Sequence, residues 1–320
     1  MKSPPFLVSF QSAEDYSAAL DSASNETYWG SLDALIKQKL PPVASVRALA
    51  CLFGLSGKFV GALRRKPESH YRTFTIRKGN KKRVIHAPRV GLKVIQKWFA
   101  NHLANAVAFD DAVFGFVPGR SAPEAAAKHA RANWVLSLDL ADFFPSVPRT
   151  KVEAALVDIG YTPHGAAIAA ALCCYGEGLA QGCPASPVLS NLVFRAQDMA
   201  LSAIAEQQAI RYTRYADDIV FSGFGEPPEG LELAVRQILA QAGWKLNEKK
   251  VKLVSAPRRL KVHGLLVHGQ SPRLTKGYRN RIRAIRHLLA VGKISADNMP
   301  RAKGHLAYAA SIDEVAGLPE

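Results

Sequence analysis

Residues 210–222 read Ile-Arg-Tyr-Thr-Arg-Tyr-Ala-Asp-Asp-Ile-Val-Phe-Ser, and they place two adjacent aspartates, Asp217 and Asp218, between two alternating apolar runs. This pattern predicts a β-hairpin with both carboxylates at its tip. Adjacent carboxylates repel each other, so a bound cation favours keeping both ionised. Oxygen ligands of this kind suit Mg²⁺, which one or two carboxylates commonly hold together with substrate phosphates. Asp-Asp at a hairpin tip is also ordinary turn chemistry, so the pair alone leaves both interpretations open.

A further acid follows an apolar strand upstream. Residues 134–147 read Trp-Val-Leu-Ser-Leu-Asp-Leu-Ala-Asp-Phe-Phe-Pro-Ser-Val, in which Asp139 ends a predicted buried strand. An isolated acid at this place could simply cap the element that follows. If the strand instead shares a sheet with the 210–222 hairpin, Asp139 meets the aspartate pair, and carboxylates converging from different strands can hold two metal ions. Such a site serves in-line displacement at phosphorus.

A third segment, residues 178–192, reads Gly-Leu-Ala-Gln-Gly-Cys-Pro-Ala-Ser-Pro-Val-Leu-Ser-Asn-Leu. Alone it is typical of a loop that leads into a helix. Taken in order, Asp139 through Phe144, Gln181-Gly182 with Ser186-Pro187, and Tyr215 through Asp218 resemble the motifs of reverse transcriptases. The resemblance implies an α+β chain with the right-hand polymerase fold: fingers, a palm built from an antiparallel sheet and helices, and a short helical thumb. It also implies RNA-directed DNA polymerase activity.

Within that family the chain resembles bacterial retron enzymes, through Cys173-Cys174-Tyr175 and the run from Tyr212 to Asp218. Two retron motifs are altered: Ala126 and His129 are kept without the preceding Asn, and Val262-His263-Gly264 replaces Val-Thr-Gly. The retron resemblance implies a structured noncoding RNA as template and primer, a single-stranded cDNA product linked to RNA, dNTPs as substrates, a partner effector protein and a role in antiphage defence.

The resemblance also implies roles for individual residues. Asp139, Asp217 and Asp218 would be the catalytic acids and would hold two Mg²⁺ ions, with Mn²⁺ able to substitute. The nucleotide would be bound by Lys78, Arg83, Phe144, Gln181 and Lys250. The nucleic acid would be contacted by His129, His263, Gly264, Arg279, Arg283 and Arg286. A core position is the alternative for the ring of Phe144.

The charge distribution favours a polyanionic partner independently of any family. The formal net charge is +16, and 25 of the 42 Lys and Arg residues fall within residues 58–97 and 258–310, which contain one acid each. Two basic segments on either side of an acidic centre are typical of a clamp on nucleic acid. The basic helix pattern at 276–289 places Arg279, Arg283 and Arg286 together, with Ile282, Ile285 and Leu289 on a packing face. A merely solvated basic face is the alternative for this helix.

The turn and loop signals along the sequence, together with the family resemblance, predict four regions. They are an N-terminal helical region (1–69), fingers (70–130), a palm with embedded fingers elements (131–258), and a primer grip with thumb (259–320). A β-hairpin is expected to turn at Gly79-Asn80, followed by a helix from about Leu92 to Phe99. Residues 166–175 are expected to form a buried helix, and Ser121 with Glu124 a capping box. No apolar run reaches the length of a membrane span. The four cysteines lack metal-site spacing, so a cytoplasmic protein is expected.

Other functions stay open at this point. They are a reverse transcriptase of the group II intron or abortive-infection type, a catalytically silent RNA-binding scaffold, and a metal-dependent nuclease. Intact Asp139, Asp217 and Gln181 disfavour the scaffold, because RNA binding alone needs no acids directed at phosphate.

The resemblance generates one test directly. The ring of Phe144 is expected to collide with a ribose 2′-hydroxyl and so to select dNTPs over rNTPs. Phe144→Ala should raise the rate of rNTP incorporation relative to dNTP incorporation, measured by primer extension with each nucleotide set. Sugar selectivity equal to that of the unmodified enzyme would remove Phe144 from this role.

Overall fold

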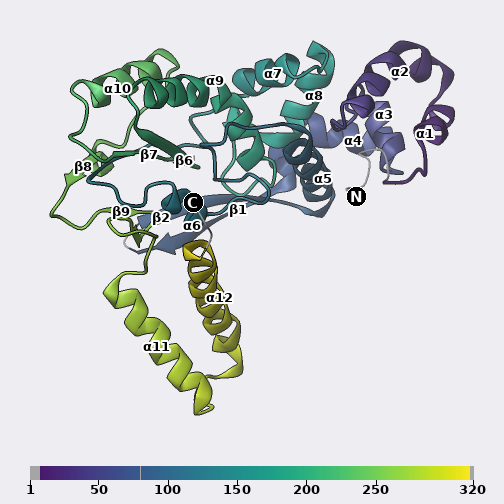
Figure 1. Cartoon of the computed structure of the whole chain (residues 1–320). Coiled ribbons are helices and arrows are strands. Elements are labelled where there is room, and N and C mark those ends of the chain that lie inside the picture. The colour runs from purple at the N-terminus through teal and green to yellow at the C-terminus, as the bar shows by residue number, and fades with distance from the viewer. Residues whose placement is uncertain (1–7, 80, 318–320) are drawn as a thin grey trace. The chain divides into compact units, whose positions relative to one another are not determined.

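A computed structural model describes residues 8–79 and 81–317, with the side chains of Lys78 and Lys81 outside the described part (Figure 1). The chain forms two compact units. The first consists of Met1–Phe109 and Asp142–Ala196, and the second of Asp110–Ala141 and Gln197–Glu320. The mixture of helices and antiparallel strands confirms the α+β class.

The first unit is mainly helical. Its helices are α1 (Ala13–Ala19), α2 (Ser22–Lys37), α3 (Val46–Leu52), α4 (Gly57–Arg65), the 3₁₀ turn η1 (Pro67–His70), α5 (Val90–Ala106), α7 (Arg149–Asp158) and α8 (Pro163–Cys173). Helix α9 (Ser186–Gln207) contains the boundary between the units. Helices α1 to α4 begin at Ser12, Asp21, Ser45 and Ser56, whose side chains accept hydrogen bonds from backbone N–H groups of the first turn.

The predicted basic hairpin of the first unit is confirmed. Strands β1 (Tyr71–Lys78) and β2 (Lys81–Pro88) pair antiparallel over their full length, and α5 follows as expected. Gly79 has a φ of +59°, which glycine adopts readily, whereas Asn80 lies outside the described residues. The helix expected over 166–175 ends at Cys173, because Cys174 and Tyr175 form β4 and pair with β5 (Gly178–Leu179).

The second unit is built around a four-stranded antiparallel sheet. Its strand order is β6 (Arg211–Tyr215), β7 (Asp218–Gly223), β3 (Trp134–Asp139) and β8 (Lys252–Ser255). The other elements are α6 (Ala122–Ala127), α10 (Leu231–Gln241), the 3₁₀ turns η2 (Glu248–Lys250) and η3 (Ala296–Asn298), β9 (Lys261–Val262), β10 (Leu265–Leu266), α11 (Lys276–Ala290) and α12 (Met299–Ala316). The capping box of α6 is present, since Ser121 bonds both the backbone N–H and the carboxylate of Glu124.

Each face of this sheet has its own core, as the two-residue period of strands requires. Val135 and Val220 pack with residues of β9, β10 and α12 on one face. On the other face Tyr212 stacks on Phe221, its cross-strand partner, with ring centroids 5.0 Å apart. Strands β3, β6 and β7 are therefore mostly buried on both sides, whereas the edge strand β8 is partly exposed.

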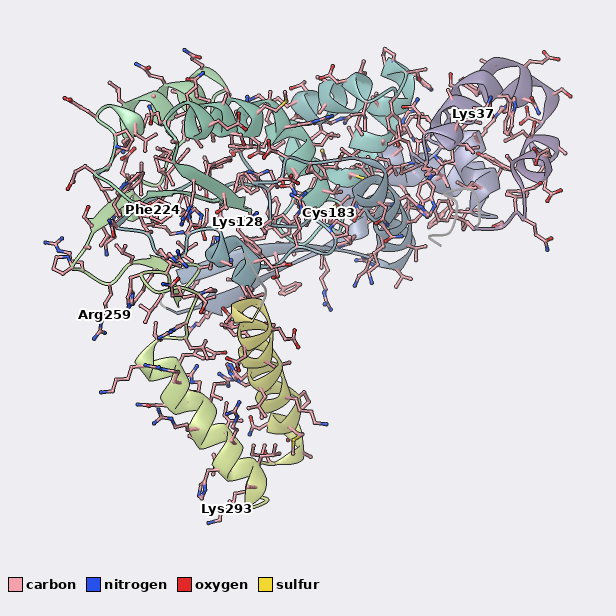
Figure 2. The ribbon with its side chains drawn as sticks, in the orientation of Figure 1. Lys37, Lys128, Cys183, Phe224, Arg259 and Lys293 are labelled. Atoms are coloured by element: carbon pink, nitrogen blue, oxygen red, sulfur yellow. The ribbon has the colours of Figure 1, made fainter. Side chains whose placement is uncertain are left out.

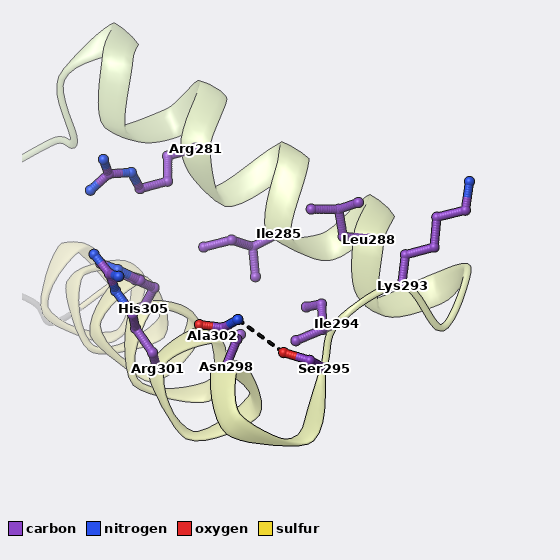
Figure 3. Close-up of a pocket in the computed structure, with 10 residues that line it drawn as sticks. All are labelled: Arg281, Ile285, Leu288, Lys293, Ile294, Ser295, Asn298, Arg301, Ala302 and His305. Atoms are coloured by element: carbon purple, nitrogen blue, oxygen red, sulfur yellow. Dashed lines mark hydrogen bonds between the residues drawn. The ribbon is translucent and has the colours of Figure 1, made fainter.

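Helices α11 and α12 lie side by side (Figure 1), and they contact each other through Tyr278 of α11 and His305 and Tyr308 of α12. Lys293 lies at the far end of the pair (Figure 2). Arg279, Arg283 and Arg286 are exposed on α11, as expected, and Ile282 is buried. Leu289 was expected on the packing face, but the groove toward α12 is lined by Ile285 and Leu288 and not by Leu289 (Figure 3).

His129 corrects one expectation. It was expected to contact nucleic acid, yet its side chain is completely buried. Its ring nitrogens share hydrogen bonds of 2.7 Å with the hydroxyls of Ser222 and Thr213, on β7 and β6. Burial, with smaller contributions from His263 and Arg211, lowers the pKa of His129 to about 3. The residue is a neutral core histidine with no surface to offer RNA.

This burial predicts a pH dependence of stability. Since the folded-state pKa of His129 is about 3 and an unfolded histidine titrates near 6.5, the unfolded chain binds the proton first. The contribution of His129 to the free energy of unfolding is therefore fully present above about pH 6.5. It is lost as pH falls toward 3, by up to about 1.4 kcal/mol per pH unit. Urea unfolding at pH 7, 6 and 5 should show a shallower pH dependence for His129→Gln than for the unmodified chain.

The matched control is His268→Gln, because His268 is exposed. This variant should keep the original slope. Identical slopes for the unmodified chain and both variants would contradict the prediction.

Candidate active site

The three predicted catalytic acids lie at one end of the palm-like sheet of the second unit. Asp139 is the last residue of β3, Asp218 is the first residue of β7, and the two are direct cross-strand partners. Asp217 precedes β7, and its carbonyl oxygen accepts a 2.9 Å hydrogen bond from the backbone N–H of Leu140. The expectation that the two acidic segments share a sheet is confirmed. Like charges directly opposite each other are destabilising, so the site needs compensating partners.

The hairpin that carries Asp217 has a tight two-residue turn. Ala216 has a φ of +58°, an uncommon conformation for a residue with a Cβ. The backbone of residues 112–115 runs beside β6 and lies very close to this turn: a Cβ on Gly115 would be 2.3 Å from the Ala216 nitrogen. Glycine at 115 therefore allows the two backbones to approach, and this approach helps to hold the strained turn.

Asp139 is compensated by two side chains from one 3₁₀ turn. Lys250 Nζ donates a hydrogen bond to Asp139 Oδ2, and Asn247 Nδ2 donates to Oδ1 at 3.3 Å. The backbone N–H of Asn247 also donates to the Asp139 carbonyl at 2.8 Å. Burial raises the pKa of Asp139 and the charge of Asp217 adds to this, whereas the hydrogen bond and charge of Lys250 oppose it. Burial alone would lower the pKa of Lys250, but the three acids raise it, so Lys250 stays a cation.

Asp218 is approached from another direction by His263. The His263 Nδ1 lies 3.8 Å from Asp218 Oδ2, and its ring centroid is 5.2 Å from that of Tyr215. Burial alone would raise the pKa of Asp218, but His263, Asp139 and Lys250 together lower it. His263 has a φ of +48°, and its buried Nε2 has no hydrogen-bond partner among the described residues.

A pocket of about 480 Å³ opens beside this cluster. Its lining consists of Ala122, Ser137, Tyr215, Asp218, Val220, His263 and Gly264. His263 and Gly264 were expected to contact nucleic acid, and they form part of the wall of a pocket that reaches Asp218. Their role toward nucleic acid stays a prediction.

The donor chemistry of the acids fits a divalent cation, because carboxylate oxygens are the hard ligands that Mg²⁺ prefers. Among the described residues no group of three or more His, Cys, Asp or Glu side chains stands in a metal-holding arrangement. Both oxygens of Asp139 are already hydrogen-bonded, to Lys250 and Asn247. A cation at Asp139 would take over the role that the Lys250 ammonium has here.

The expected nucleotide-binding residues other than Lys250 belong to the first unit. The Gln181 carbonyl accepts a 2.8 Å hydrogen bond from the His86 backbone N–H, and a Cβ on Gly182 would lie 2.8 Å from the His86 carbonyl oxygen. The Gln181-Gly182 turn therefore packs closely against the backbone of β2. Arg83 is exposed on β2, Phe144 is half-buried beside Phe143, and the side chain of Lys78 lies outside the described residues. All four assignments stay predictions.

Sequence reasoning missed two parts of the site. Asn247 precedes Lys250 by three residues in the sequence, and that spacing was the available signal for a shared turn. Arg214 is fully buried behind the hairpin and pairs with Asp198 of α9. An arginine within an apolar alternation is a weak signal for a buried ion pair, and nothing near Asp198 in the sequence identifies it as the partner.

Comparison with known proteins decides the family. A model of the family "Reverse transcriptase (RNA-dependent DNA polymerase)" matches residues 76–268, which include all the candidate acids. The chain belongs to the reverse transcriptase family. Retron Ec86 reverse transcriptase from Escherichia coli is 31% identical over 253 residues, covering 76% of this chain and 77% of that protein. Retron Mx65 reverse transcriptase from Myxococcus xanthus is 32% identical over 304 residues, covering 86% and 70%.

Retron Ec73 reverse transcriptase from Escherichia coli is 30% identical over 275 residues, covering 80% of this chain and 87% of that protein. These similarities support a retron RNA-directed DNA polymerase, as the motifs implied. Apo telomerase from Candida tropicalis aligns with a TM-score of 0.47 and 10% identity over 66% of this chain and 56% of that one, a likeness too low to support a conclusion. No helix among the described residues of this reverse transcriptase is long and apolar enough to span a membrane.

The contact between Lys250 and Asp139 predicts a kinetic effect. Lys250→Met removes the cation that offsets the repulsion between the acids of this reverse transcriptase. We expect the rate of DNA synthesis to fall about tenfold or more, which corresponds to about 1.4 kcal/mol in the activation free energy. Single-turnover primer extension measures it. Lys249→Met, at an exposed position in the same turn, should leave the rate unchanged; equal rates for the two variants would contradict the prediction.

Proposed function

We propose that this retron reverse transcriptase polymerises dNTPs with two Mg²⁺ ions at Asp139, Asp217 and Asp218, and that Mn²⁺ can substitute. One observation carries the proposal: β3 ends and β7 begins with directly opposed carboxylates, and the Asp217 carbonyl accepts a hydrogen bond from the residue after Asp139. Carboxylates that converge from separate strands are the arrangement that two-metal phosphoryl transfer uses.

Each side chain of the cluster has a distinct part in this proposal. Bound divalent ions would acidify the primer hydroxyl and neutralise the charge that develops on the phosphoryl oxygens. Asp139 and Asp217 are the principal ligands, and Asp218 is the weaker or outer one. Asn247 and Lys250 both donate hydrogen bonds to the Asp139 carboxylate, so they orient it, and the Lys250 ammonium offsets its charge until a cation takes over.

The remaining assignments rest on the resemblance and on exposure. Arg83 is exposed, as a residue that neutralises a triphosphate must be, and Lys78 is assigned the same role. Gln181 is proposed to contact the new base pair and Phe144 to exclude the ribose 2′-hydroxyl. His263 and Gly264 are proposed to contact the primer strand, and Arg279, Arg283 and Arg286 the phosphate backbone, whose recognition positions a duplex without reading its sequence.

The proposed partner is a structured noncoding RNA that serves as both template and primer and stays linked to its cDNA. A basic chain with 25 of its 42 cationic residues in two segments supports a nucleic-acid partner. The effector protein, the antiphage role and the cytoplasmic location are proposed from the retron resemblance and the sequence alone.

A substitution at the hairpin tests the catalytic proposal. Asp217→Asn keeps the size of the side chain but removes its charge, so DNA synthesis should fall at least about a thousandfold while RNA binding and the circular dichroism spectrum stay unchanged. Asp158→Asn is the matched control, since Asp158 is an exposed acid at the end of α7. Full primer extension by Asp217→Asn would refute the proposed site.

The nucleic acid that co-purifies with the full-length chain tests the partner. Sequential digestion with ribonuclease and deoxyribonuclease should reveal one RNA species joined to single-stranded DNA, and the DNA should be missing when Asp217→Asn is purified from the same host. Recovery of unjoined, heterogeneous RNA alone would overturn the retron-type product.

A further inference from the structure

Arg214 is a completely buried cation directly beneath the catalytic hairpin. It lies on β6, and its side chain has no exposed surface. Burial alone would lower the pKa of Arg214, but its pairing with Asp198 raises it, so the guanidinium is charged. Taking a charge out of water is costly, and a buried ion pair frequently adds nothing to stability compared with a well-packed apolar pair. The position of this pair therefore calls for an explanation other than stability.

Asp198 holds the guanidinium in a fixed orientation. Arg214 Nε donates to Asp198 Oδ1 and Nη2 donates to Oδ2, both at 2.7 Å. The hydroxyl of Tyr212 donates to the same Oδ1 at 2.7 Å. A two-point contact between a planar guanidinium and a carboxylate fixes direction as well as distance. The helix α9 thus sets the direction in which the third nitrogen of Arg214 points.

That third nitrogen reaches the turn of the hairpin. Arg214 Nη1 donates to the carbonyl oxygen of Ala216 at 3.0 Å. This carbonyl belongs to the peptide group that joins Ala216 to Asp217. Because a peptide group is planar, a hydrogen bond to its oxygen fixes the plane and with it the position of the Asp217 Cα.

The next peptide group is fixed from the other side. The Asp217 carbonyl accepts from the Leu140 N–H at 2.9 Å, so both peptide groups that flank Asp217 have an assigned partner. The positive φ of Ala216 makes these partners necessary, since a residue in that conformation persists only when its surroundings enforce it. Gly115 supplies close backbone packing but donates no side chain to the turn.

We propose that Arg214, oriented by Asp198, is a positioning residue that sets the place of the Asp217 carboxylate opposite Asp139. The inference rests on the proposed catalytic role of Asp217. It assigns a kinetic role to an ion pair that does not touch substrate: the pair acts on the reaction only through the Ala216–Asp217 peptide group.

Arg214→Lys is the decisive variant. Lysine keeps the charge but lacks the planar fork, so it cannot bind both Asp198 oxygens and the Ala216 carbonyl in one geometry. We expect the kcat for dNTP incorporation to fall about 10- to 100-fold, since small misplacements of a catalytic group have effects of this size. The KM for dNTP and the affinity for RNA should change less than about twofold. Mn²⁺ binding, followed by electron paramagnetic resonance, should weaken in parallel with kcat.

A stability control separates positioning from general loosening of the sheet. Ser222→Ala removes a buried hydrogen bond to His129 in the same sheet but leaves the hairpin turn intact. It should lower the melting temperature while keeping kcat and Mn²⁺ binding. Tyr212→Phe, which removes one donor from Asp198, should lower kcat by about two- to fivefold and provides the test if Arg214→Lys does not fold.

The possible outcomes distinguish failure of the positioning role from failure of the proposed catalytic site. Unchanged kcat in the folded variants, or a kcat loss in Ser222→Ala equal to that in Arg214→Lys at a similar melting temperature, would overturn the inference. If Asp217→Asn is inactive and Arg214→Lys is normal, only the positioning role fails. If Asp217→Asn is fully active, the proposed catalytic site itself fails.

Discussion

Two carboxylates face each other across adjacent antiparallel strands, and the palm-like sheet must hold them there against their repulsion. The cross-strand pairing of Asp139 with Asp218 is fixed by the register of β3 and β7, in which Trp134 pairs with Gly223 at the other end. Because side chains alternate between faces, a slip of one residue would move the acid and every apolar neighbour to the opposite face. The apolar cores on both faces therefore protect the geometry of the acids.

Compensation for this repulsion comes from segments far away in the sequence. Lys250 and Asn247 reach Asp139 from a turn more than a hundred residues downstream, and His263 approaches Asp218 from the segment after β9. The two carboxylates also differ in their environments: burial raises the pKa of Asp139 despite the opposing effect of Lys250. His263, with Asp139 and Lys250, lowers the pKa of Asp218 despite its burial. Such inequality is typical of functional carboxylate pairs, because their environments separate two otherwise identical groups.

Local patterns predicted the elements that depend on neighbouring residues. The alternation around Asp217 gave the hairpin, the apolar run before Asp139 gave its strand, and the Ser121 capping box gave the start of α6. Failures occurred where the tertiary environment decides. The retron resemblance implied that His129 contacts nucleic acid, but hydroxyls on β7 and β6 bond both of its nitrogens in the core. Leu289 follows the helical period of Ile282, yet it is Leu288 that lines the groove toward α12 together with Ile285.

The two faces of the sheet are stabilised by different physical means. On one face the buried His129 is neutral and bonds the hydroxyls of Ser222 and Thr213, whereas the other face buries an ionised pair between α9 and β6. An apolar contact resists compression but has little directional preference, so it could not fix the plane of one peptide group. The guanidinium of Arg214 can, because its donors lie at fixed angles and three of its nitrogens have assigned acceptors. A buried charge is costly for stability, but the guanidinium of Arg214 makes directional hydrogen bonds that an apolar residue of the same volume could not make.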